Sequence, residues 1–369
     1  MKNFVIAPFP PPLGGVSAAA SNLVRVLQRQ VADVTVFDTS GHHEREDLYA
    51  PKGLPSYLRN LRQFPRFLRE VVLRGGRDDA HHLFVTSDRA FYRDFVFLLV
   101  LRLLRRRVLV HLHSKPAGEH FVDPRRIARF GRMLSLANRV FVLSPEHAAF
   151  FGRYVAPDRL LVLENFVLAE DFAVGRATRP GDMLYVSRLS QMKGTRELLA
   201  ATDILVNRDG RRGLRVTIAG NADTEQTQAE VETYVREHRL GDCIELAGLV
   251  TGDRKRRLFA ENGVFVFPSR FENSPVVLKE ATQAGMAVIA SDIPANLNIV
   301  RRSGNALLFP AGDPEALAAA MTRVMDEPGL FAALRAAAAG APKFDEHYAW
   351  SVLREHCVER QPRSVNGRE

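Results

Sequence analysis

The sequence contains few cysteines and no long apolar run. Only Cys243 and Cys357 occur among 369 residues, which argues against a disulfide framework or a thiolate metal cage and favours a reducing compartment. Charged residues interrupt the most apolar segment, Phe91 to Leu104, so it lacks the about 20 apolar residues that a membrane-spanning helix needs. The first strand candidate runs directly into "PFPPP", which leaves no room for a signal peptide. A cytoplasmic protein is therefore expected.

Acidic residues are scarce in part of the N-terminal half. From Lys52 to Arg139 there are 19 Lys and Arg against 7 Asp and Glu, whereas the whole chain has a net charge of only +9. Within this segment, "SYLRNLRQFPRFLREVVLRGGR" interleaves apolar residues with arginine at roughly helical spacing, as in a helix that lies on anionic lipid. A solvated helix with its apolar side in the core fits as well, and nucleic acid or polyphosphate binding would give the same pattern.

Short apolar runs alternate with longer amphipathic segments along the first half of the chain. This alternation indicates βα units and a parallel sheet that helices cover on both faces. The strand candidates are Phe4–Ala7, Val34–Phe37, Leu83–Thr86, Val108–His113, Val140–Leu143 and Leu160–Leu163. The helix candidates are Ser17–Gln30, Ser56–Arg74, Phe91–Arg105, Pro124–Ala137 and Pro145–Arg153.

The alternation restarts after "VGRATRPGD", residues 174–182, which is typical of an interdomain linker. Two doubly wound α/β domains, residues 1–174 and 175–344, are expected to face each other across a cleft. Residues 345–369 are expected to form a helix able to pack back on the first domain, with a disordered tail. The further strand candidates are Met183–Ser187, Arg215–Ala219, Cys243–Leu246, Val264–Phe267 and Ala287–Ala290.

Two glutamates eight positions apart flank a predicted helix start in "SRFENSPVVLKEA". Ser274 is a good helix N-cap and Pro275 a good first helical residue. Glu272 would then lie in the loop, and Glu280 about five residues, roughly 7.5 Å, into the helix. Because free N–H groups at a helix start favour phosphate, a ligand with a central diphosphate could place a hydroxylated end beside each carboxylate. Nucleotide sugars have this shape.

A second motif, "YVSRLSQMKGTRELLAA", combines a strand, a loop and a helix. Arg188 and Lys193 lie in the loop, and Gly194 lies near the helix start. Two cations oppose the preference of a helix start for negative charge, unless an anion binds between them. The alternative is that both cations are solvated loop residues. The glutamate pair in the same predicted domain makes this alternative less favoured.

Glycines and histidines near strand ends give weaker signals. Gly14 and Gly15 allow close approach of a ligand, or form a plain turn, since the full dinucleotide fingerprint is absent. "HLH" places His111 and His113 on one face of a strand. Zinc binding with His120 as a third ligand is disfavoured, because no Cys or Asp/Glu cluster completes the site. His113 could hydrogen-bond a substrate hydroxyl, and His111 is better read as a buried structural residue.

Charge for a leaving diphosphate must come from the protein. No Asp-x-Asp pair occurs in the chain, which argues against a metal-chelated diphosphate. Arg188, Lys193 and the helix start would supply positive charge instead, so no cofactor and no metal are expected. Gly220, which ends the strand of "TIAGNADTE", lies where a nucleotide could bind.

Taken together, "GG" after the first strand, "HLH", "VSRLSQMKG", "AG" at 219–220, "FPSRFENSPVVLKEA", "AGMAVIASD" and "NALLFPAGDPEALAAA" resemble the retaining GT-B glycosyltransferases of family 4. The motifs cover most of the chain in order and spacing. The resemblance implies two Rossmann-like domains and a UDP- or GDP-linked sugar donor. It also implies transfer to an acceptor hydroxyl with retention of the anomeric configuration.

The resemblance implies roles for particular residues. Glu272 and Glu280 match the ends of an E-x7-E signature, in which the first orients the donor sugar and the second contacts the ribose. Arg188 and Lys193 match the pair that stabilises the departing diphosphate. His113 matches a cleft histidine near the donor sugar. The donor-binding backbone is expected at Gly15, Gly220, Asn273, Ser274 and Val276.

Two features depart from the family pattern. Ser187 stands where glycine is usual before the arginine, and "ENSP" lacks the Gly-Phe-Gly often found after the first glutamate. Backbone N–H groups from Asn273 to Val276 remain, except at Pro275, so diphosphate binding is expected to survive with altered detail.

The acceptor implied is a saccharide or lipid-linked saccharide of a bacterial surface polysaccharide or lipopolysaccharide. The basic first domain would hold it, with the protein peripheral on the inner face of the cell membrane. A nucleotide-sugar epimerase of similar fold is the main alternative. A basic nucleic-acid-binding protein is less favoured, since it has no use for the paired glutamates, and no nucleic acid partner is expected.

Overall fold

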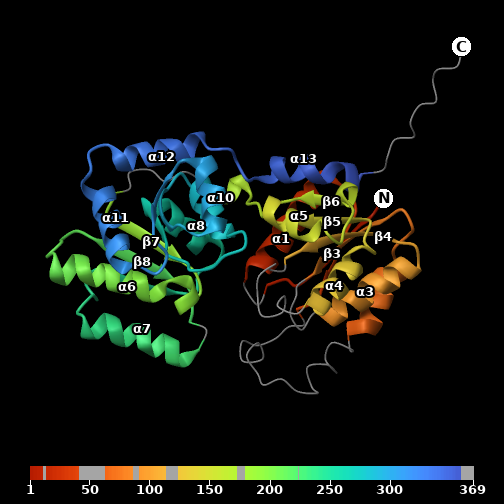
Figure 1. Cartoon of the computed structure of the whole chain (residues 1–369), viewed down its shortest axis with the longest axis horizontal. Helices are drawn as coiled ribbons and strands as arrows, with labels where there is room; N and C mark the ends of the chain where they lie inside the picture. Colours follow the sequence, from red (N-terminus) through yellow and green to blue (C-terminus); the bar gives the residue numbers. More distant parts are fainter. Residues whose placement is uncertain are drawn as a thin grey trace, which may run out of the picture. The chain divides into compact units, whose positions relative to one another are not determined.

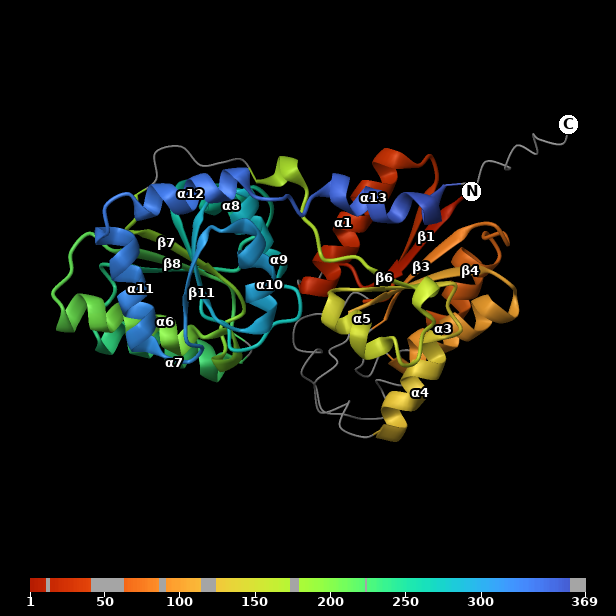
Figure 2. The same cartoon turned by 45° about the horizontal axis from the view of Figure 1, so that its top comes forward.

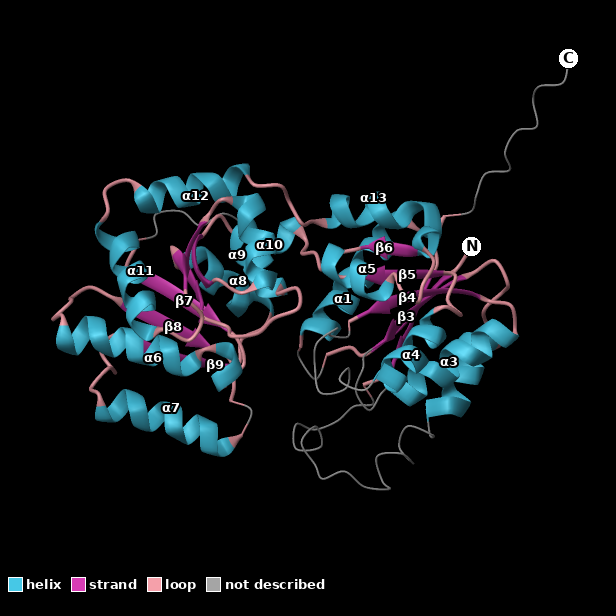
Figure 3. Ribbon diagram, viewed as in Figure 1, coloured by secondary structure: helices cyan, strands magenta, loops and turns pink. Residues whose placement is uncertain are grey.

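The structure is a computed structural model that describes residues 1–10, 14–40, 63–85, 91–113, 124–172, 179–222 and 224–358. It contains two compact units, Met1–Phe166 with Glu346–Glu369, and Val167–Asp345. Each unit has a six-stranded sheet flanked by helices (Figure 1), and the strands are seen most clearly in Figure 3. The α/β class and the two doubly wound sheets are confirmed. The sequence predicts a domain boundary after residue 174, and the first segment of the first unit ends at Phe166. It predicts a final helix from residue 345, and that helix begins at Glu346.

In the first unit, all six strand candidates are strands. Their order across the sheet is β2-β1-β3-β4-β5-β6, and all neighbours are parallel. Because β1 pairs with both β2 and β3, the direction of sheet growth reverses between β1 and β3. The bounds are β1 Asn3–Ala7, β2 Val34–Asp38, β3 Ala80–Val85, β4 Arg107–Leu112, β5 Arg139–Val142 and β6 Leu160–Val162.

The helices of the first unit cover a core rich in aromatic rings. Phe67 and Phe97 stack with centroids 4.0 Å apart, and both meet the ring of Phe37 edge-on. Of the candidate helix Ser56–Arg74, residues 56–62 lie outside the described part, and the chain is helical from residue 63 into the π-helical η2. The bounds are α1 Gly15–Gln30, η2 Leu68–Val72, α3 Phe91–Leu103, α4 Pro124–Leu134, α5 Pro145–Phe151, η4 Pro157–Arg159 and α13 Glu346–Cys357.

The C-terminal helix α13 is part of the first unit (Figure 2). It buries Leu353 and packs beside α1. The Tyr348 hydroxyl accepts a hydrogen bond from the backbone N–H of Glu164 at 3.0 Å. The Asn3 side chain, in β1, donates to the carbonyl oxygen of Cys357 at 3.3 Å. Two ends of the sequence thus complete one core.

In the second unit the strand order is β12-β11-β10-β7-β8-β9, and all neighbours are parallel. The chain adds β8 and β9 on one side of β7 and then places β10 on the other side. The sequence did not predict β12, an edge strand whose residues are mostly half-exposed. The bounds are β7 Asp182–Val186, β8 Arg215–Ala219, β9 Ile244–Gly248, β10 Val264–Phe267, β11 Ala287–Ser291 and β12 Ala306–Phe309.

The strand–helix alternation continues through the second unit. Since β7 begins at Asp182, the predicted linker is one residue too long at that end, and residues 174–178 of it lie outside the described part. No described helix is long and apolar enough to cross a membrane. The bounds are η5 Ala169–Asp171, η6 Gln191–Lys193, α6 Thr195–Asp203, η7 Ile204–Arg208, α7 Glu225–Glu237, α8 Gly252–Glu261, α9 Val276–Gln283, α10 Pro294–Ser303, α11 Pro314–Asp326 and α12 Leu330–Gly340.

Candidate active site

The predicted site residues of the second unit lie at its topological switch point. β7 and β10 are neighbours, but their ladder contains only the pairs Met183–Val264 and Leu184–Phe265, whereas β7 and β8 pair along all five residues. The carboxyl ends of β7 and β10 therefore leave the ladder, and one loop follows each strand. In open α/β sheets this is where ligands bind.

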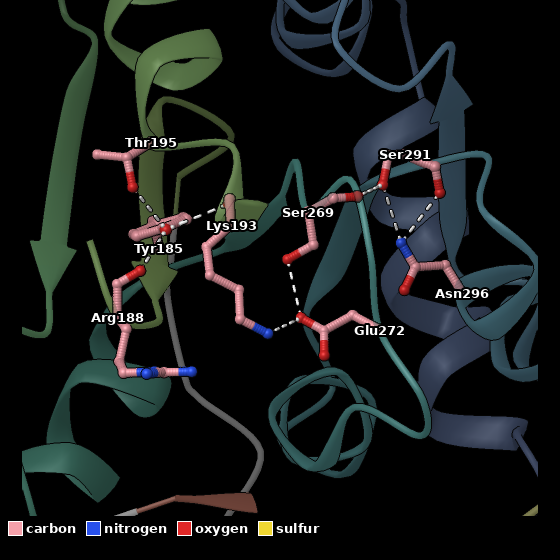
Figure 4. Close-up of polar contacts among 8 residues, drawn as sticks. All are labelled: Tyr185, Arg188, Lys193, Thr195, Ser269, Glu272, Ser291 and Asn296. Carbon is pink, nitrogen blue, oxygen red and sulfur yellow. Dashed lines mark hydrogen bonds and ion pairs between the residues drawn. The ribbon is translucent and has the colours of Figure 1, made fainter. Parts of the chain in front are cut away.

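Tyr185 in β7 holds the loop that carries the two predicted cations. Its fully buried hydroxyl lies 3.3 Å from the carbonyl oxygen of Arg188, 3.2 Å from that of Lys193 and 3.0 Å from Oγ1 of Thr195 (Figure 4). Burial raises the pKa of Tyr185 well above its ordinary value, and the nearby carboxylate of Glu272 adds to the rise. The hydroxyl therefore stays protonated and ties both ends of the loop to the sheet.

Two glycines permit close approach of backbone at this point. Gly194 adopts φ +73° as the N-cap of α6, and a Cβ there would overlap the carbonyl oxygen of Pro268, which follows β10. Gly220 follows β8 with φ +144°, and a Cβ there would overlap the carbonyl oxygen of Ser187. Both positions thus need glycine for their backbone conformation and for space.

Lys193 and Glu272 meet across the switch point. Nζ of Lys193 lies 2.5 Å from Oε1 of Glu272, and the Ser269 hydroxyl donates to the same oxygen at 2.9 Å. Figure 4 shows the side chains of Arg188 and Lys193 extending the same way from their loop, with Glu272 opposite Lys193. The fold thus brings a carboxylate from the neighbouring loop against Lys193, which is therefore not a solvated loop cation.

Further contacts join the two loops. The Arg270 guanidinium forms an ion pair with the buried Glu197 of α6, and its Nε donates to that carboxylate at 2.9 Å. The backbone N–H of Arg270 donates to the carbonyl oxygen of Met192 at 3.0 Å. The Ser291 hydroxyl donates to the carbonyl oxygen of Ser269 and links this loop to β11. The two sides of the switch point are therefore fixed relative to each other.

Glu280 lies five residues into α9, as predicted, and is paired with Lys255 of α8. Nζ of Lys255 lies 2.7 Å from Oε1 and 2.6 Å from Oε2, but only the contact with Oε1 has hydrogen-bond geometry. Oε2 is buried and accepts no hydrogen bond from the described residues. It lies beside Nζ of Lys255 within this ion pair.

The start of α9 differs from the prediction by one residue. Pro275, with φ −67° and ψ 113°, occupies the N-cap position, so Val276 is the first helical residue. Ser274 is therefore not the N-cap, and its hydroxyl accepts a hydrogen bond from Nζ of the buried Lys279 at 3.3 Å. No side chain caps α9. Its first N–H groups and the half-buried Asn273 lie between Glu272 and Glu280 along the chain.

In the first unit, His113 and Gly15 lie at the carboxyl edge of the sheet. His113 directly follows β4, is half-buried, and stacks on Phe84 with centroids 5.0 Å apart. Burial lowers the pKa of His113 to about 4, so the imidazole is neutral at pH 7. His111 is buried, as predicted, and its ring also stacks on the ring of Phe84, with centroids 4.8 Å apart. Gly15 is the first residue of α1, and a Cβ there would meet nothing within 4 Å.

Within the described residues, no group of three or more His, Cys, Asp or Glu side chains is arranged to hold a metal ion. His120, the third ligand of the disfavoured zinc site, lies outside the described residues.

Sequence reasoning missed several residues of the site: Tyr185, Thr195, Lys255, Ser269 and Arg270. Lys255 is one of four consecutive basic residues in "RKRR", and nothing local marks which of them turns inward. Tyr185 carries a weak signal, since a hydroxyl inside the apolar run "MLYV" requires a partner when buried.

Comparisons with known proteins agree with this arrangement. Residues 168–340 match the family "Glycosyl transferases group 1". A GDP-mannose:cellobiosyl-diphosphopolyprenol alpha-mannosyltransferase of Xanthomonas oryzae pv. oryzae is 30% identical over 329 residues, which are 85% of this chain and 84% of that protein. The amylovoran biosynthesis glycosyltransferase AmsK of Erwinia amylovora is 30% identical over 185 residues, 48% of this chain and 44% of the relative.

Solved structures share the fold over nearly the whole chain. The sucrose-phosphate synthase of Thermosynechococcus elongatus has a TM-score of 0.73 at 19% identity and covers 96% of this chain and 98% of its own. Anabaena Alr3699/HepE in complex with UDP and glucose has a TM-score of 0.71 at 16% identity and covers 96% and 99%. The fold is thus GT-B, and the match to the Xanthomonas relative over most of both chains shows that the chain belongs to the group 1 glycosyl transferases and is a glycosyltransferase.

Proposed function

We propose that this enzyme transfers a hexosyl group from a UDP- or GDP-linked sugar to an acceptor hydroxyl with retention of configuration, as a member of family 4. One observation carries the proposal: the ion pairs Lys193–Glu272 and Lys255–Glu280 flank the uncapped start of α9 at the switch point of the second sheet. Two carboxylates around a helix start suit a ligand with a diphosphate between two hydroxylated groups.

The contacts suggest how the donor is held. The Glu280 carboxylate accepts a ribose hydroxyl, while the ion pair with Lys255 holds the carboxylate in place. The diphosphate lies against the N–H groups of Asn273, Ser274 and Val276 at the start of α9, and near Gly220.

The same proposal assigns the chemistry. Lys193 has three N–H donors, so it can hold Glu272 and still donate to a departing diphosphate together with Arg188. Glu272 orients the sugar ring, and no metal ion is required. Neutral His113 donates or accepts at a sugar hydroxyl, and Gly15 leaves room for a phosphate in the first unit.

A thermal-shift screen tests donor binding. The protein is heated with UDP, GDP, ADP and their sugar conjugates, with and without EDTA. A nucleotide at 100 times its Kd should add about 2.7 kcal/mol to stability. The proposal is supported if one nucleoside diphosphate raises Tm equally with and without EDTA. This stabilisation should be lost in Glu280→Ala and kept in Glu261→Ala, a control at an exposed residue. If no nucleotide raises Tm, the result contradicts the proposed donor site.

The stereochemistry and the role of Glu272 need the product and a trapping experiment. NMR should show the donor's anomeric configuration in the product, and inversion would contradict the proposal. Glu272→Gln should weaken the orientation of the donor sugar. In the wild-type enzyme, no sugar should become covalently attached to Glu272. Mass spectrometry of the quenched reaction that finds a sugar on Glu272 would replace the orienting role with a nucleophilic one.

We further propose a role in bacterial surface polysaccharide or lipopolysaccharide synthesis, with a saccharide or lipid-linked saccharide as acceptor and the protein peripheral on the inner membrane face. Two relatives support it by their names, one with a cellobiosyl-diphosphopolyprenol acceptor and one in amylovoran biosynthesis. The basic residues between Lys52 and Arg139 fit an anionic surface. Flotation with liposomes should depend on their anionic lipid content; equal flotation without it would remove the membrane contact.

A further inference from the structure

A hollow lined by arginine lies within the first unit, at the amino-terminal edge of its sheet. Its volume is about 350 Å³, within the range of roughly 300–1,000 Å³ typical of ligand pockets. The residues that line it are Arg77, Arg102, Arg105, Arg106, Arg107, Asn138 and Arg139. We call this set the arginine pocket.

The strands position the arginine pocket far from the carboxyl edge. Arg107 begins β4 and Arg139 begins β5, while Arg77 comes three residues before β3. All these strands are parallel, so their starts share one edge. β4 has six residues and so spans about 20 Å. The pocket is therefore about that far from His113, at the other end of β4.

Neutral acceptors hold several guanidinium groups of the arginine pocket. Arg102 donates to Oδ1 of Asn138 at 2.9 Å and to the carbonyl oxygen of Arg106 at 3.1 Å. Arg106 donates to the carbonyl oxygen of Val72 and Arg139 to that of Asn138. These neutral acceptors fix the guanidinium groups without cancelling their charge. Apart from Arg107, none of the pocket arginines forms an ion pair with a described Asp or Glu. Nε of Arg106 is buried and has no hydrogen-bond partner among the described residues.

The backbone at Arg105 adds a second observation. Arg105 lies two residues after the last residue of α3 and has φ 56°; its N–H donates to the carbonyl oxygen of Arg102, and the N–H of Arg106 donates to that of Leu101. Glycine is usual at this position of a helix C terminus, because other residues are strained in the left-handed region. Here a charged side chain occupies it, at the rim of a pocket whose cations already repel one another. An anion bound in the pocket would relieve the repulsion between these cations.

We propose that the arginine pocket binds an anion that carries two or more phosphate charges. All of its cations are arginine, whose planar fork of N–H groups matches phosphate oxygens in pairs. The exposed Arg77 and Arg105 form the rim, and the half-buried Arg102, Arg106 and Arg139 line the interior. The anion comes either from solution, as a diphosphate, or from a lipid headgroup. The pocket does not depend on the proposed donor site, which belongs to the second unit.

Site-resolved arginine footprinting tests the proposal. The full chain is treated with phenylglyoxal, with and without pyrophosphate at equal ionic strength, and modification is mapped by peptide mass spectrometry. Pyrophosphate should slow modification of Arg77, Arg105 and Arg139 several-fold, and leave the exposed Arg239 unchanged. Equal rates at the pocket with and without pyrophosphate overturn the proposal. Protection of Arg188 reports the donor site separately, so failure of one site is distinguishable from failure of the other.

A matched pair of variants sharpens the test. Arg239 has φ 53° after α7, so Arg239→Gly and Arg105→Gly each remove one charge and one strained arginine. Arg105→Gly should fold at least as well as the wild type and raise the pyrophosphate concentration that half-protects Arg139 about tenfold, the loss expected for one charge-assisted contact. Arg239→Gly should leave this concentration unchanged. Equal effects of the two variants would show that the pocket contributes nothing beyond net charge.

Vesicles distinguish the two sources of the anion. Phosphatidylcholine vesicles with phosphatidic acid should protect Arg77 and Arg105 if a lipid headgroup binds, whereas pure phosphatidylcholine should not. Protection by pyrophosphate but not by these vesicles assigns a dissolved ligand. Both results support the pocket, and protection by neither probe rejects it.

Discussion

The carboxylate of Glu272 shows how single residues hold the candidate site. Its side chain is only 12% exposed and contacts Nζ of Lys193 and the Ser269 hydroxyl. Partly buried ion pairs of this kind are costly to break from one side, because the remaining charge loses its partner while it stays shielded from water. In the surface pair Arg208–Glu315, both side chains are more than half exposed, and such pairs contribute little.

We therefore expect Lys193→Met to lower the free energy of unfolding by about 2 kcal/mol, the contribution of a hydrogen bond to a charged group. The double variant Lys193→Met/Glu272→Gln should lose less than the sum of the two single variants, since the second change removes the stranded charge. Urea denaturation of the four proteins measures this coupling. Arg208→Gln is the control and should change little. Additive losses would mean that the pair is not coupled in solution.

At the scale of elements, the β7–α6 loop is held by backbone contact as well as by side chains. Gly194 adopts the left-handed conformation directly against Pro268. Gly213 adopts nearly the same conformation, φ +77°, with nothing within 4 Å of a Cβ. A comparison of the two glycines thus separates the cost of a left-handed backbone conformation from the cost of a steric clash with a neighbouring residue.

Gly213→Ala should cost about 1 kcal/mol, because only the left-handed conformation opposes it. Gly194→Ala also forces the loop away from Pro268, and should cost about 3 kcal/mol. The same displacement moves Lys193, so nucleotide binding should fall in Gly194→Ala and persist in Gly213→Ala. Thermal unfolding and the nucleotide screen measure both effects. Equal losses of stability would place the loop farther from Pro268 than the structure does.

The neighbouring strands β3 and β4 contain buried histidines that make stability depend on pH. Burial lowers the pKa of His81 to about 4 and that of His82 to about 3, and it lowers the pKa of His111 well below 6.5. Nδ1 of His82 lies 2.9 Å from Nε2 of His111, which also favours the neutral forms. An unfolded chain protonates these rings near pH 6.5, whereas the folded protein resists protonation.

The folded-state pKa values of these histidines lie below the unfolded ones, so their contribution to stability is full above about pH 6.5 and is lost as pH drops from about 6.5 towards 4. Each such histidine contributes a slope of about 1.4 kcal/mol per pH unit in that window. His113→Asn should flatten the slope by one histidine, because the pKa of His113 is lowered to about 4. Urea midpoints between pH 7 and 5 measure this. A midpoint independent of pH would show that the rings are hydrated in solution.

At the scale of the whole molecule, each unit has its own core, and the first is closed by the end of the chain. Leu353 of α13 is fully buried within the first unit, and Leu317 of α11 is fully buried within the second. Truncating either residue should therefore weaken one unit more than the other.

Leu353→Ala should cost the first unit about 3 kcal/mol, a typical value for a buried leucine. Hydrogen exchange should quicken in β1 and β6, while the strands of the second unit keep their protection. Leu317→Ala should produce the reverse pattern. Faster exchange throughout the chain in both variants would show that the units unfold as one.

Much of the fold could be predicted because local patterns report burial. Apolar runs such as "VFVF" in β10 form strands buried on both faces of a parallel sheet, and the alternation with amphipathic segments predicts the doubly wound class. β12 was missed because an edge strand is only partly buried. Ser274 was assigned as the N-cap from residue type alone, but the structure places Pro275 there.

The sequence by itself determined the α/β class, the restart of the pattern and the spacing of Glu272 and Glu280, since each depends on residues close together in the chain. Only the tertiary structure decided which partners meet. Lys193 reaches Glu272 across 79 positions because β10 inserts beside β7, and Lys255 faces Glu280 from another helix. The arginine pocket gathers residues from Arg77 to Arg139. Periodicity encodes which side of an element is buried, whereas strand order, which it does not encode, decides which loops become neighbours.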